Sequence, residues 1–300
     1  MSAGLVIVGA SHAGIALAAE LRAADFRPAI TLISDETAEP YHRPHLSKEC
    51  LEADVPPGLL KPAAFYAEKA MVRLGAGVVA IHSSRRRIEM TGGKMLDYET
   101  LILATGARAR TLPAGLPGAE LALTLRNLDD LQRLRARLAS ARRLVIIGGG
   151  LIGLEMAAAA RTKGISVDVV ECADRLMSRS LSPELAALVR ERHAAAGITF
   201  HIGSKVRSVT EERVELEDGA VILADLVVAS VGNQPRSELA EAAVLACDDG
   251  IIVEFDCATS LPGIFAIADC ARWPEPGLAR GVRHESIAPL SGRRSWLRSD

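Results

Sequence analysis

Short, continuous apolar runs that lead into longer segments with helical periodicity dominate the hydrophobic pattern of this chain. Residues 5–8, 30–33, 101–104 and 144–147 are such runs. An apolar run of this length, bounded by turn residues, is typical of a buried strand. Strands that alternate with helical segments predict an α/β fold.

Two of these strands end in the same glycine pattern, about 140 residues apart. The first copy is LVIVGASHAGIALAAELR and the second is RLVIIGGGLIGLEMAAAA. In such a strand–turn–helix unit the first glycine allows the tight turn, the second lets a pyrophosphate approach the backbone, and the third packs the helix against the strand. The turn positions are Gly9, Ser11 and Gly14 in the first copy and Gly148, Gly150 and Gly153 in the second. The repetition predicts two Rossmann-like dinucleotide-binding domains.

An acidic residue follows the next strand after each glycine turn. Residues 30–33 lead to Ser34, Asp35 and Glu36, and residues 166–170 lead to Glu171. At about 20 residues after the turn, a carboxylate is placed to accept hydrogen bonds from a ribose hydroxyl. Either copy alone is also compatible with an ordinary tight turn and a solvated acid, and the pair favours nucleotide binding.

The remaining elements predict one domain inserted into another. Residues 78–81 and 88–90 indicate short strands in a meander, and the proline-bearing segment 112–118 indicates a linker. A helix is expected at 129–140 and another at 183–196, with further strands at 199–202, 206–209, 214–216 and 226–231. We therefore assign residues 1–112 and 236–300 to one domain and 113–235 to the other.

A third chemical motif lies near the end of the chain. Residues 263–269 form an apolar run that ends in Asp269. A carboxylate at the end of a buried strand is placed to accept hydrogen bonds from a ligand hydroxyl, such as one on a sugar or ribityl chain. The alternative is a helix N-cap.

Composition narrows the class of protein. The 300 residues are 49% hydrophobic and carry a formal net charge of −2, which does not favour a nucleic-acid partner. No apolar run is long enough to span a bilayer, and the first residues lack the basic region of a signal peptide. Five cysteines are scattered without a CxxC or CxxxxC pair, so we expect a cytoplasmic protein with reduced thiols, without a metal site or a redox-active disulfide.

The order of these motifs carries a family resemblance. The first glycine turn is followed by PYHRPHLSKECL, then ATG, the second turn with IGLE, and IFAIADC. The chain resembles the FAD-dependent pyridine nucleotide oxidoreductases, in the branch of the ferredoxin, putidaredoxin and rubredoxin reductases. The resemblance implies an FAD domain with an inserted NAD domain. It also implies hydride transfer from NADH to the flavin, followed by single-electron transfer to a small iron–sulfur protein.

Residue by residue, the resemblance implies two sets of cofactor contacts. Lys48 is expected near the flavin ring and Glu155 nearest the nicotinamide ring, and these two are the catalytic candidates. The implied FAD contacts are Gly9, Ser11, Ala13, Gly14, Asp35, Lys48, Arg126, Asp269 and Ile287. The implied NAD contacts are Gly148, Gly150, Gly153, Glu155 and Glu171.

The chain departs from the family pattern at several places. Ser11 replaces the middle glycine of the first turn, which narrows the approach to the pyrophosphate. Ala268 replaces the glycine that usually precedes the aspartate, so a methyl group crowds the ribityl chain or forces a change in φ. Relatives with a redox-active cysteine have it shortly before the PY pair, where this chain has Thr37–Glu39. Cys50 is expected to be a buried thiol on a helix.

The last departure concerns the end of the chain. After Ile287 the expected helix is replaced by a segment with Pro289, Ser291 and Gly292. We expect the family's third domain to be absent and residues 288–300 to be disordered.

Three functions are compatible with these observations. The first is an NADH-dependent reductase of a ferredoxin or rubredoxin, for which Arg85–Arg87, Arg272, Arg280 and Arg283 could face an acidic partner, although they could equally form a solvated face. The second is an NADH oxidase or diaphorase that reduces oxygen or quinones. The third is a non-catalytic nucleotide-binding remnant.

Overall fold

The computed structural model describes residues 4–68, 71–278 and 280–283, which divide into two compact units. Unit 1 contains the described residues of Met1–His42, Leu59–Arg108 and Gln234–Asp300; unit 2 contains Arg43–Gly58 and Ala109–Asn233. The sequence boundaries place residues 43–58 in the first domain, whereas in the structure they cluster with the second unit. They do so because helix α2 (Glu49–Ala53) packs against helix α5 (Leu151–Thr162).

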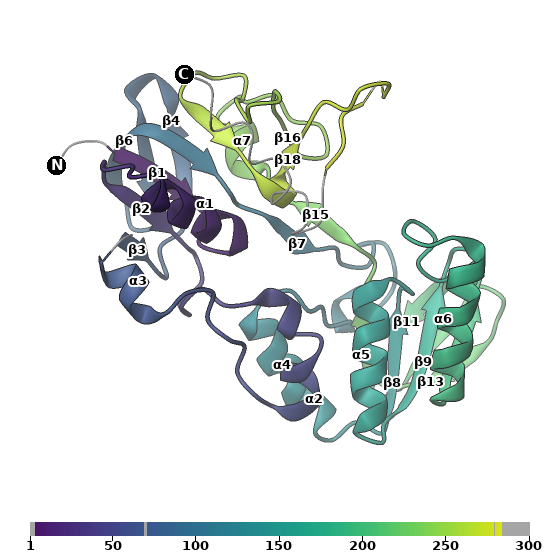
Figure 1. Cartoon of the computed structure of the whole chain (residues 1–300). Helices are drawn as coiled ribbons and strands as arrows, with labels where there is room; N and C mark the ends of the chain where they lie inside the picture. Colours follow the sequence, from purple (N-terminus) through teal and green to yellow (C-terminus); the bar gives the residue numbers. More distant parts are fainter. Residues whose placement is uncertain (1–3, 69–70, 279, 284–300) are drawn as a thin grey trace. The chain divides into compact units, whose positions relative to one another are not determined.

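A seven-stranded mixed sheet forms the centre of unit 1 (Figure 1). Its strand order is β3-β2-β1-β6-β5-β4, and β17 also pairs with β6. All pairings among β3, β2, β1, β6 and β17 are parallel. Strand β5 pairs antiparallel with both β6 and β4. The strands are β1 (Gly4–Val8), β2 (Ile30–Ile33), β3 (Met71–Arg73), β4 (Val78–His82), β5 (Arg87–Met90), β6 (Lys94–Leu103) and β17 (Ile264–Ala266).

Strand β6 joins the two halves of this sheet. Its first residues pair with β5 in the antiparallel hairpin, and its last residues lie between β1 and β17. The sequence predicts only residues 101–104 as a strand. In the first half of β6 the charged residues Lys94 and Asp97 interrupt the apolar ones and most positions are exposed, so this half lacks the continuous apolar run that marks the buried half.

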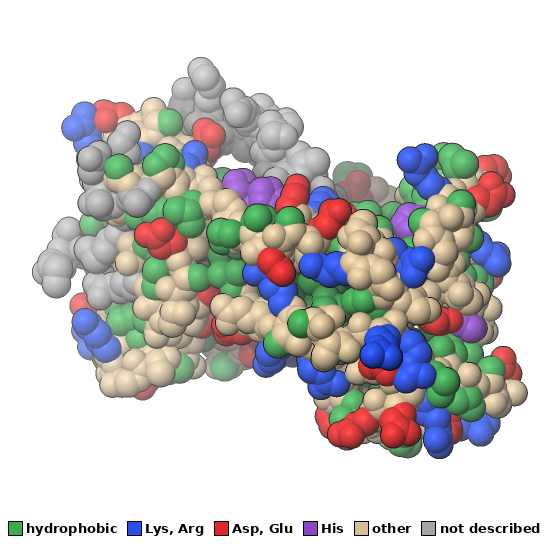
Figure 2. All heavy atoms as spheres, turned by 90° about the horizontal axis from the view of Figure 1, so that it is seen from below, with side chains coloured by type: hydrophobic (Ala, Val, Ile, Leu, Met, Phe, Trp, Pro, Cys, Tyr) green, Lys and Arg blue, Asp and Glu red, His purple; other side chains and the backbone are tan. Residues whose placement is uncertain are grey.

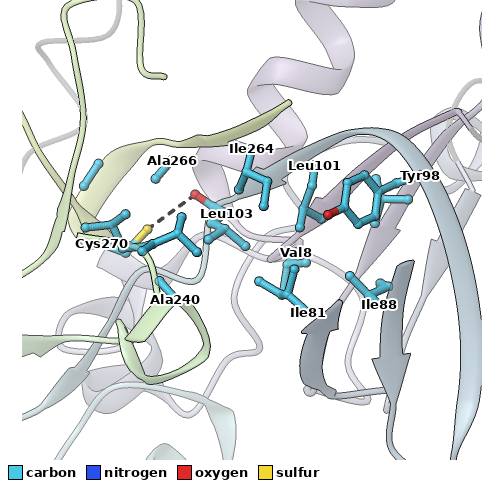
Figure 3. Packing of buried hydrophobic residues seen from close by; sticks show 14 of the residues in the cluster. Val8, Ile81, Ile88, Tyr98, Leu101, Leu103, Ala240, Ile264, Ala266 and Cys270 are labelled. Carbon is cyan, nitrogen blue, oxygen red and sulfur yellow. Dashed lines mark hydrogen bonds between the residues drawn. The ribbon is translucent and has the colours of Figure 1, made fainter. Parts of the chain in front are cut away.

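The core of unit 1 is formed by side chains from both halves of the sheet (Figure 3). Val8, Leu101 and Ile264 from the parallel strands pack with Ile81 and Ile88 from the hairpin. Further elements surround the sheet: α1 (His12–Ala23), α3 (Ala63–Glu68), α7 (Glu238–Ala242), the short strands β16 (Ile251–Ile252) and β18 (Ala271–Arg272), and one-turn 3₁₀ helices at Ser83–Arg85 and Ala268–Cys270.

Unit 2 is built on a four-stranded parallel sheet of order β10-β9-β8-β14. Helices α5 and α6 (Pro183–Ala195) pack against these strands (Figure 1). The strands are β8 (Arg143–Ile147), β9 (Ser166–Glu171), β10 (Ile198–Ile202) and β14 (Leu226–Ala229), and a separate antiparallel sheet contains β11 (Val206–Val209), β12 (Arg213–Leu216) and β13 (Val221–Leu223). The remaining elements are α2, α4 (Leu128–Leu138) and 3₁₀ turns at Arg43–His45 and Ala119–Leu121.

Local signals account for the starts of the predicted helices in unit 2. The side chain of Asn127 accepts the backbone N–H of Asp130, whose carboxylate accepts N–H groups in return, and this capping box begins α4. At the start of α6 the Ser182 hydroxyl accepts the backbone N–H of Leu185, and Pro183 is the first residue of the helix. Both helices end within one or two residues of the predicted positions.

Strands β7 (Ala107–Ala109) and β15 (Asn233–Pro235) pair with each other where the chain passes between the units. The insertion predicted from the sequence is therefore an insertion in the structure, since the chain leaves unit 1 along β7 and returns along β15.

On the face drawn in Figure 2, acidic and basic side chains are interspersed. Pairs such as Arg87 with Asp97 and Arg143 with Asp225 bring opposite charges together. This mixture agrees with the near-balanced composition.

Candidate functional site

The first glycine turn lies at the carboxyl end of β1. Gly9 has φ +118°, and a methyl group there would lie 2.0 Å from the carbonyl oxygen of Ala104. A methyl group at Gly14 would lie 2.0 Å from the carbonyl oxygen of Gly9. Both positions therefore require glycine, because helix α1 packs directly onto the strand ends.

Ser11 is the N-cap of α1 and adopts φ −112° and ψ −160°. This extended conformation is open to any residue, so serine in place of the middle glycine introduces no backbone strain. Ala13 lies in the first turn of the helix, which contains no acidic residue. Backbone N–H groups in the first turn of a helix lack intrahelical acceptors and favour an anion.

Asp35 and Asp269 lie at the same edge of the sheet as this turn. Asp35 follows β2 and Asp269 follows β17, and both strands belong to the parallel set that includes β1 and β6. The Nη2 atom of Arg236 donates to Oδ2 of Asp35 at 2.8 Å. The sequence places Asp269 at the end of a strand; the structure corrects this, because β17 ends at Ala266 and Asp269 lies in the following 3₁₀ turn.

Hydrogen bonds to β6 fix the segment that carries Asp269. The backbone N–H of Ile267 donates to the carbonyl oxygen of Leu103 at 2.9 Å, and Sγ of Cys270 donates to the same oxygen at 3.4 Å (Figure 3). Between them Ala268 has φ +63°, in the left-handed region. The change in φ expected from the alanine substitution is not seen, since the chain keeps a conformation that favours glycine.

The second glycine turn has the same geometry at the carboxyl end of β8. Gly148 has φ +111°, and a methyl group there would lie 2.2 Å from the carbonyl oxygen of Ser230. At Gly153 a methyl group would lie 2.4 Å from the carbonyl oxygen of Gly148. Gly150, the N-cap of α5, differs, because a methyl group there would meet no atom within 4 Å. The turn is thus closed toward the strands and open in front of the helix.

Glu171 fixes this turn from the neighbouring strand. Its Oε2 accepts the backbone N–H of Gly149 at 2.7 Å, and its Oε1 accepts that of Ala173 at 2.7 Å. The carboxylate therefore lies beside the turn with its remaining lone pairs available for a hydroxyl donor.

Lys48, Ser47 and Glu155 form a polar cluster within unit 2. Lys48 Nζ lies 3.4 Å from Oε1 of Glu155, and the Ser47 hydroxyl donates to Oε2 at 2.6 Å. The Glu155 side chain is 20% exposed and that of Lys48 is 47% exposed. A pocket of about 220 Å³ is lined by these three residues together with Glu52, Ala158, Ala159 and Thr162. The structure thus brings together the two catalytic candidates.

Arg126 also belongs to unit 2, where its backbone N–H donates to Oδ2 of Asp130 at 2.8 Å and its carbonyl oxygen accepts from Nη1 of Arg43 at 2.9 Å. Lys48 and Arg126 are therefore in a different unit from Gly9, Asp35 and Asp269. Ile287, like the segment 288–300, lies outside the described residues.

Both turns fit a dinucleotide. Each offers the backbone N–H donors of a helix start without an acidic residue in its first turn, and each has a carboxylate after the adjacent strand. Because a methyl group at Gly150 would meet no atom within 4 Å, the second turn is open where a pyrophosphate would approach the helix start. The donor set fits FAD at the first turn and NAD at the second, as the sequence resemblance implies.

Two contacts were missed by the sequence analysis. Ser47, whose hydroxyl donates to Glu155, lies inside the PYHRPHLSK segment. Its position next to the candidate Lys48 is the sequence feature that could have indicated this contact. Arg236, which pairs with Asp35, follows it by 201 residues, and no local pattern indicates that contact.

None of the five cysteines, all of which lie in the described residues, forms a disulfide. Burial raises the pKa of Cys50 and Cys270, and it raises the pKa of Cys247 to about 11. Cys50 lies on helix α2 with 1% of its surface exposed, which confirms the buried thiol predicted for this position. Thiols with raised pKa values are poor nucleophiles at neutral pH.

Several arginines considered for an acidic partner are paired with carboxylates of this chain. Arg280 Nη2 lies 2.7 Å from Oδ1 of Asp248, and Arg87 Nε lies 2.6 Å from Oδ1 of Asp97. Arg272 Nη1 lies 3.9 Å from Oδ2 of Asp249 and also donates to the Asp248 carbonyl oxygen at 2.7 Å. These pairs reduce the positive charge that this group of arginines presents.

No helix in the described part of the chain combines the length and apolarity needed to cross a bilayer. Among the same residues, no group of three or more His, Cys, Asp or Glu side chains is arranged to hold a metal ion.

Known proteins resemble this chain over almost its whole length. The chain is 39% identical over 294 residues to rhodocoxin reductase from Rhodococcus erythropolis, covering 94% of this chain and 68% of the relative. A ferredoxin reductase structure from Rhodopseudomonas palustris superimposes with a TM-score of 0.90 at 40% identity, covering 94% and 72% of the two chains. The covalent putidaredoxin reductase–putidaredoxin complex gives a TM-score of 0.88 at 37% identity, covering 95% and 72%.

A family model described as pyridine nucleotide-disulphide oxidoreductase matches residues 3–285. The match includes both glycine turns, the Lys48–Glu155 cluster and Asp269. The chain belongs to the pyridine nucleotide-disulphide oxidoreductase family.

Proposed function

We propose that this chain is an NADH-dependent flavoprotein reductase that passes electrons singly to a small iron–sulfur protein of the ferredoxin or rubredoxin type. The observation that carries the proposal is the duplication, within one chain, of a glycine turn at the carboxyl edge of a parallel sheet, each with an acid after the neighbouring strand. The relatives named rhodocoxin and putidaredoxin reductase support the choice of acceptor class.

In this proposal the glycine turn of each domain binds one nucleotide, and the FAD set also includes Arg126 from residues 113–235. Residues 1–112 and 236–300 bind FAD, and residues 113–235 bind NADH. The geometry of Gly9 and Gly14 supports the first assignment, and the turn that Glu171 fixes supports the second. The full FAD set is Gly9, Ser11, Ala13, Gly14, Asp35, Lys48, Arg126, Asp269 and Ile287, and the NAD set is Gly148, Gly150, Gly153, Glu155 and Glu171.

The protein's own residues bind and orient, while the cofactors supply the redox chemistry. When bound, a flavin accepts hydride from NADH and can release its electrons one at a time, so the protein needs no acid–base triad. Glu155 holds the ammonium group of Lys48, and Ser47 holds the other oxygen of Glu155. We assign to this cluster the role of keeping a cation at a fixed position beside the reacting rings.

Acceptor assays on the purified protein test the proposal. The protein is loaded with FAD, its visible spectrum is recorded, and NADH oxidation is followed with ferredoxin, with rubredoxin and with oxygen alone. We expect flavin bands that bleach with NADH and turnover that rises with an iron–sulfur acceptor. Turnover with oxygen or quinones alone would instead indicate an NADH oxidase or diaphorase. A protein that retains no flavin would indicate a non-catalytic remnant.

We also propose a cytoplasmic location. Five cysteines without a disulfide support this, since cysteines of proteins in oxidising compartments are usually joined in disulfides. Fractionation of cells that express the protein, with oxidised and reduced thiol counts, tests it.

A further inference from the structure

One arginine of unit 2 extends across the edge of the sheet where the second glycine turn lies. Arg179 belongs to the loop after β9, yet its Nη2 lies 3.5 Å from the position of a methyl group at Gly232, beyond the end of β14. Strand β8, which carries the turn at Gly148, lies between β9 and β14 in the sheet. The loop and the side chain of Arg179 together therefore reach from the β9 side of the glycine turn to its β14 side.

The loop that carries Arg179 rests directly on the turn. The backbone N–H of Met177 donates to the carbonyl oxygen of Gly149 at 3.0 Å. The side chain of Leu176 is 1% exposed, and a methyl group at Gly149 would lie 2.5 Å from its Cδ2. These contacts hold the residues two and three positions before Arg179 against the glycine turn.

The guanidinium of Arg179 has no compensating partner in the described part of the chain. It is exposed and forms neither a hydrogen bond nor an ion pair with another described residue. The nearby carboxylate of Glu171 instead accepts the N–H groups of Gly149 and Ala173. An unpaired cation thus lies beside a helix start that itself favours an anion.

We propose that Arg179 binds the pyrophosphate of the nicotinamide dinucleotide, an inference that rests on the proposed function. A planar guanidinium matches two phosphate oxygens, and it adds a charge-assisted hydrogen bond to those of the backbone N–H groups. Its place on the β14 side of the turn is opposite Glu171, which lies on the β9 side and faces the adenosine ribose. Arg179 therefore strengthens binding of NADH and NADPH alike and does not read the 2′ position.

Calorimetric binding to the full chain tests this role with two probes. ADP-ribose contains the pyrophosphate, and adenosine lacks every phosphate. We expect Arg179→Gln to raise the Kd for ADP-ribose about 10-fold, as lost charge-assisted hydrogen bonds would. The Kd for adenosine and the ratio of NADPH to NADH affinities should stay unchanged. Arg179→Lys should recover part of the loss, because it restores the charge without the planar fork.

Arg190→Gln is the matched control, since Arg190 is an exposed arginine on α6 of the same unit. It should leave every Kd unchanged. Three results would overturn the role of Arg179 but leave the proposed function standing. They are the same Kd for ADP-ribose in Arg179→Gln and wild type, a loss of adenosine affinity as large as the loss of ADP-ribose affinity, or a changed ratio of NADPH to NADH affinities. Wild-type protein that binds no ADP-ribose would overturn the proposed nucleotide site as well.

Discussion

Replacement of Ala268 by glycine should stabilise this protein. Ala268 adopts φ +63° in the turn that precedes Asp269, and hydrogen bonds from Ile267 and Cys270 to Leu103 hold the turn in place. A left-handed conformation costs an alanine roughly 1–2 kcal/mol. Glycine relieves that cost but increases the conformational entropy of the unfolded chain, which offsets about 0.4–1 kcal/mol. The net expectation is a gain of about 0.5–1 kcal/mol.

Thermal unfolding at saturating FAD measures this gain. For a chain of this size it corresponds to a rise in Tm of roughly 1–3 °C. Ala266→Gly is the matched control, because Ala266 lies two residues earlier in strand β17 and is fully buried. At that position the glycine variant loses a buried methyl group, and its unfolded chain gains conformational entropy without any relief of strain in the folded state. The free energy of unfolding should therefore fall by about 1–2 kcal/mol. A fall of similar size for Ala268→Gly would refute the argument from backbone strain.

Three further predictions concern individual carboxylates. Asp269→Ala should lower FAD retention after dialysis, because a buried polar group left without its partner costs about 1–3 kcal/mol of binding free energy. Unchanged retention would exclude the proposed contact between Asp269 and the ribityl chain. Glu171→Gln preserves an acceptor for the backbone N–H of Gly149 but removes the charge that repels a 2′-phosphate. The ratio of kcat/KM for NADPH to kcat/KM for NADH should therefore rise about 10-fold. An unaltered ratio would contradict the proposed contact between Glu171 and the adenosine ribose. Arg143 holds the pKa of Asp225 down from 3.8 to about 2, so this pair stabilises the fold above pH 4 and loses that contribution as the pH falls toward 2. The shift sets an upper limit of about 2.5 kcal/mol, and solvent screening of these partly exposed side chains reduces it to about 1 kcal/mol. Asp225→Asn should therefore cost about 1 kcal/mol in urea unfolding at pH 7 and nothing near pH 2, and an equal loss at both pH values would rule out the ionic origin.

Elements with a strong local pattern were predicted closely. The strand at 30–33 has the predicted bounds, and helices α4 and α6 begin at residues with recognisable capping signals. The mostly exposed first half of β6 and the short 3₁₀ turn at Asp269 were not predicted, because neither carries a continuous apolar run of its own. Both are held by neighbouring strands instead.

The sequence by itself determined the α/β class, the two glycine turns and the acids that follow them. The roles of Gly9 and Gly148 can be predicted from the sequence, because the requirement for glycine arises within a few residues, where a helix begins directly after a strand. The tertiary structure alone decided that Ser47 and Lys48 meet Glu155, which lies 108 residues beyond Ser47, and that Arg179 reaches Gly232. Such contacts depend on which helices and loops pack together, and no local sequence pattern records that packing.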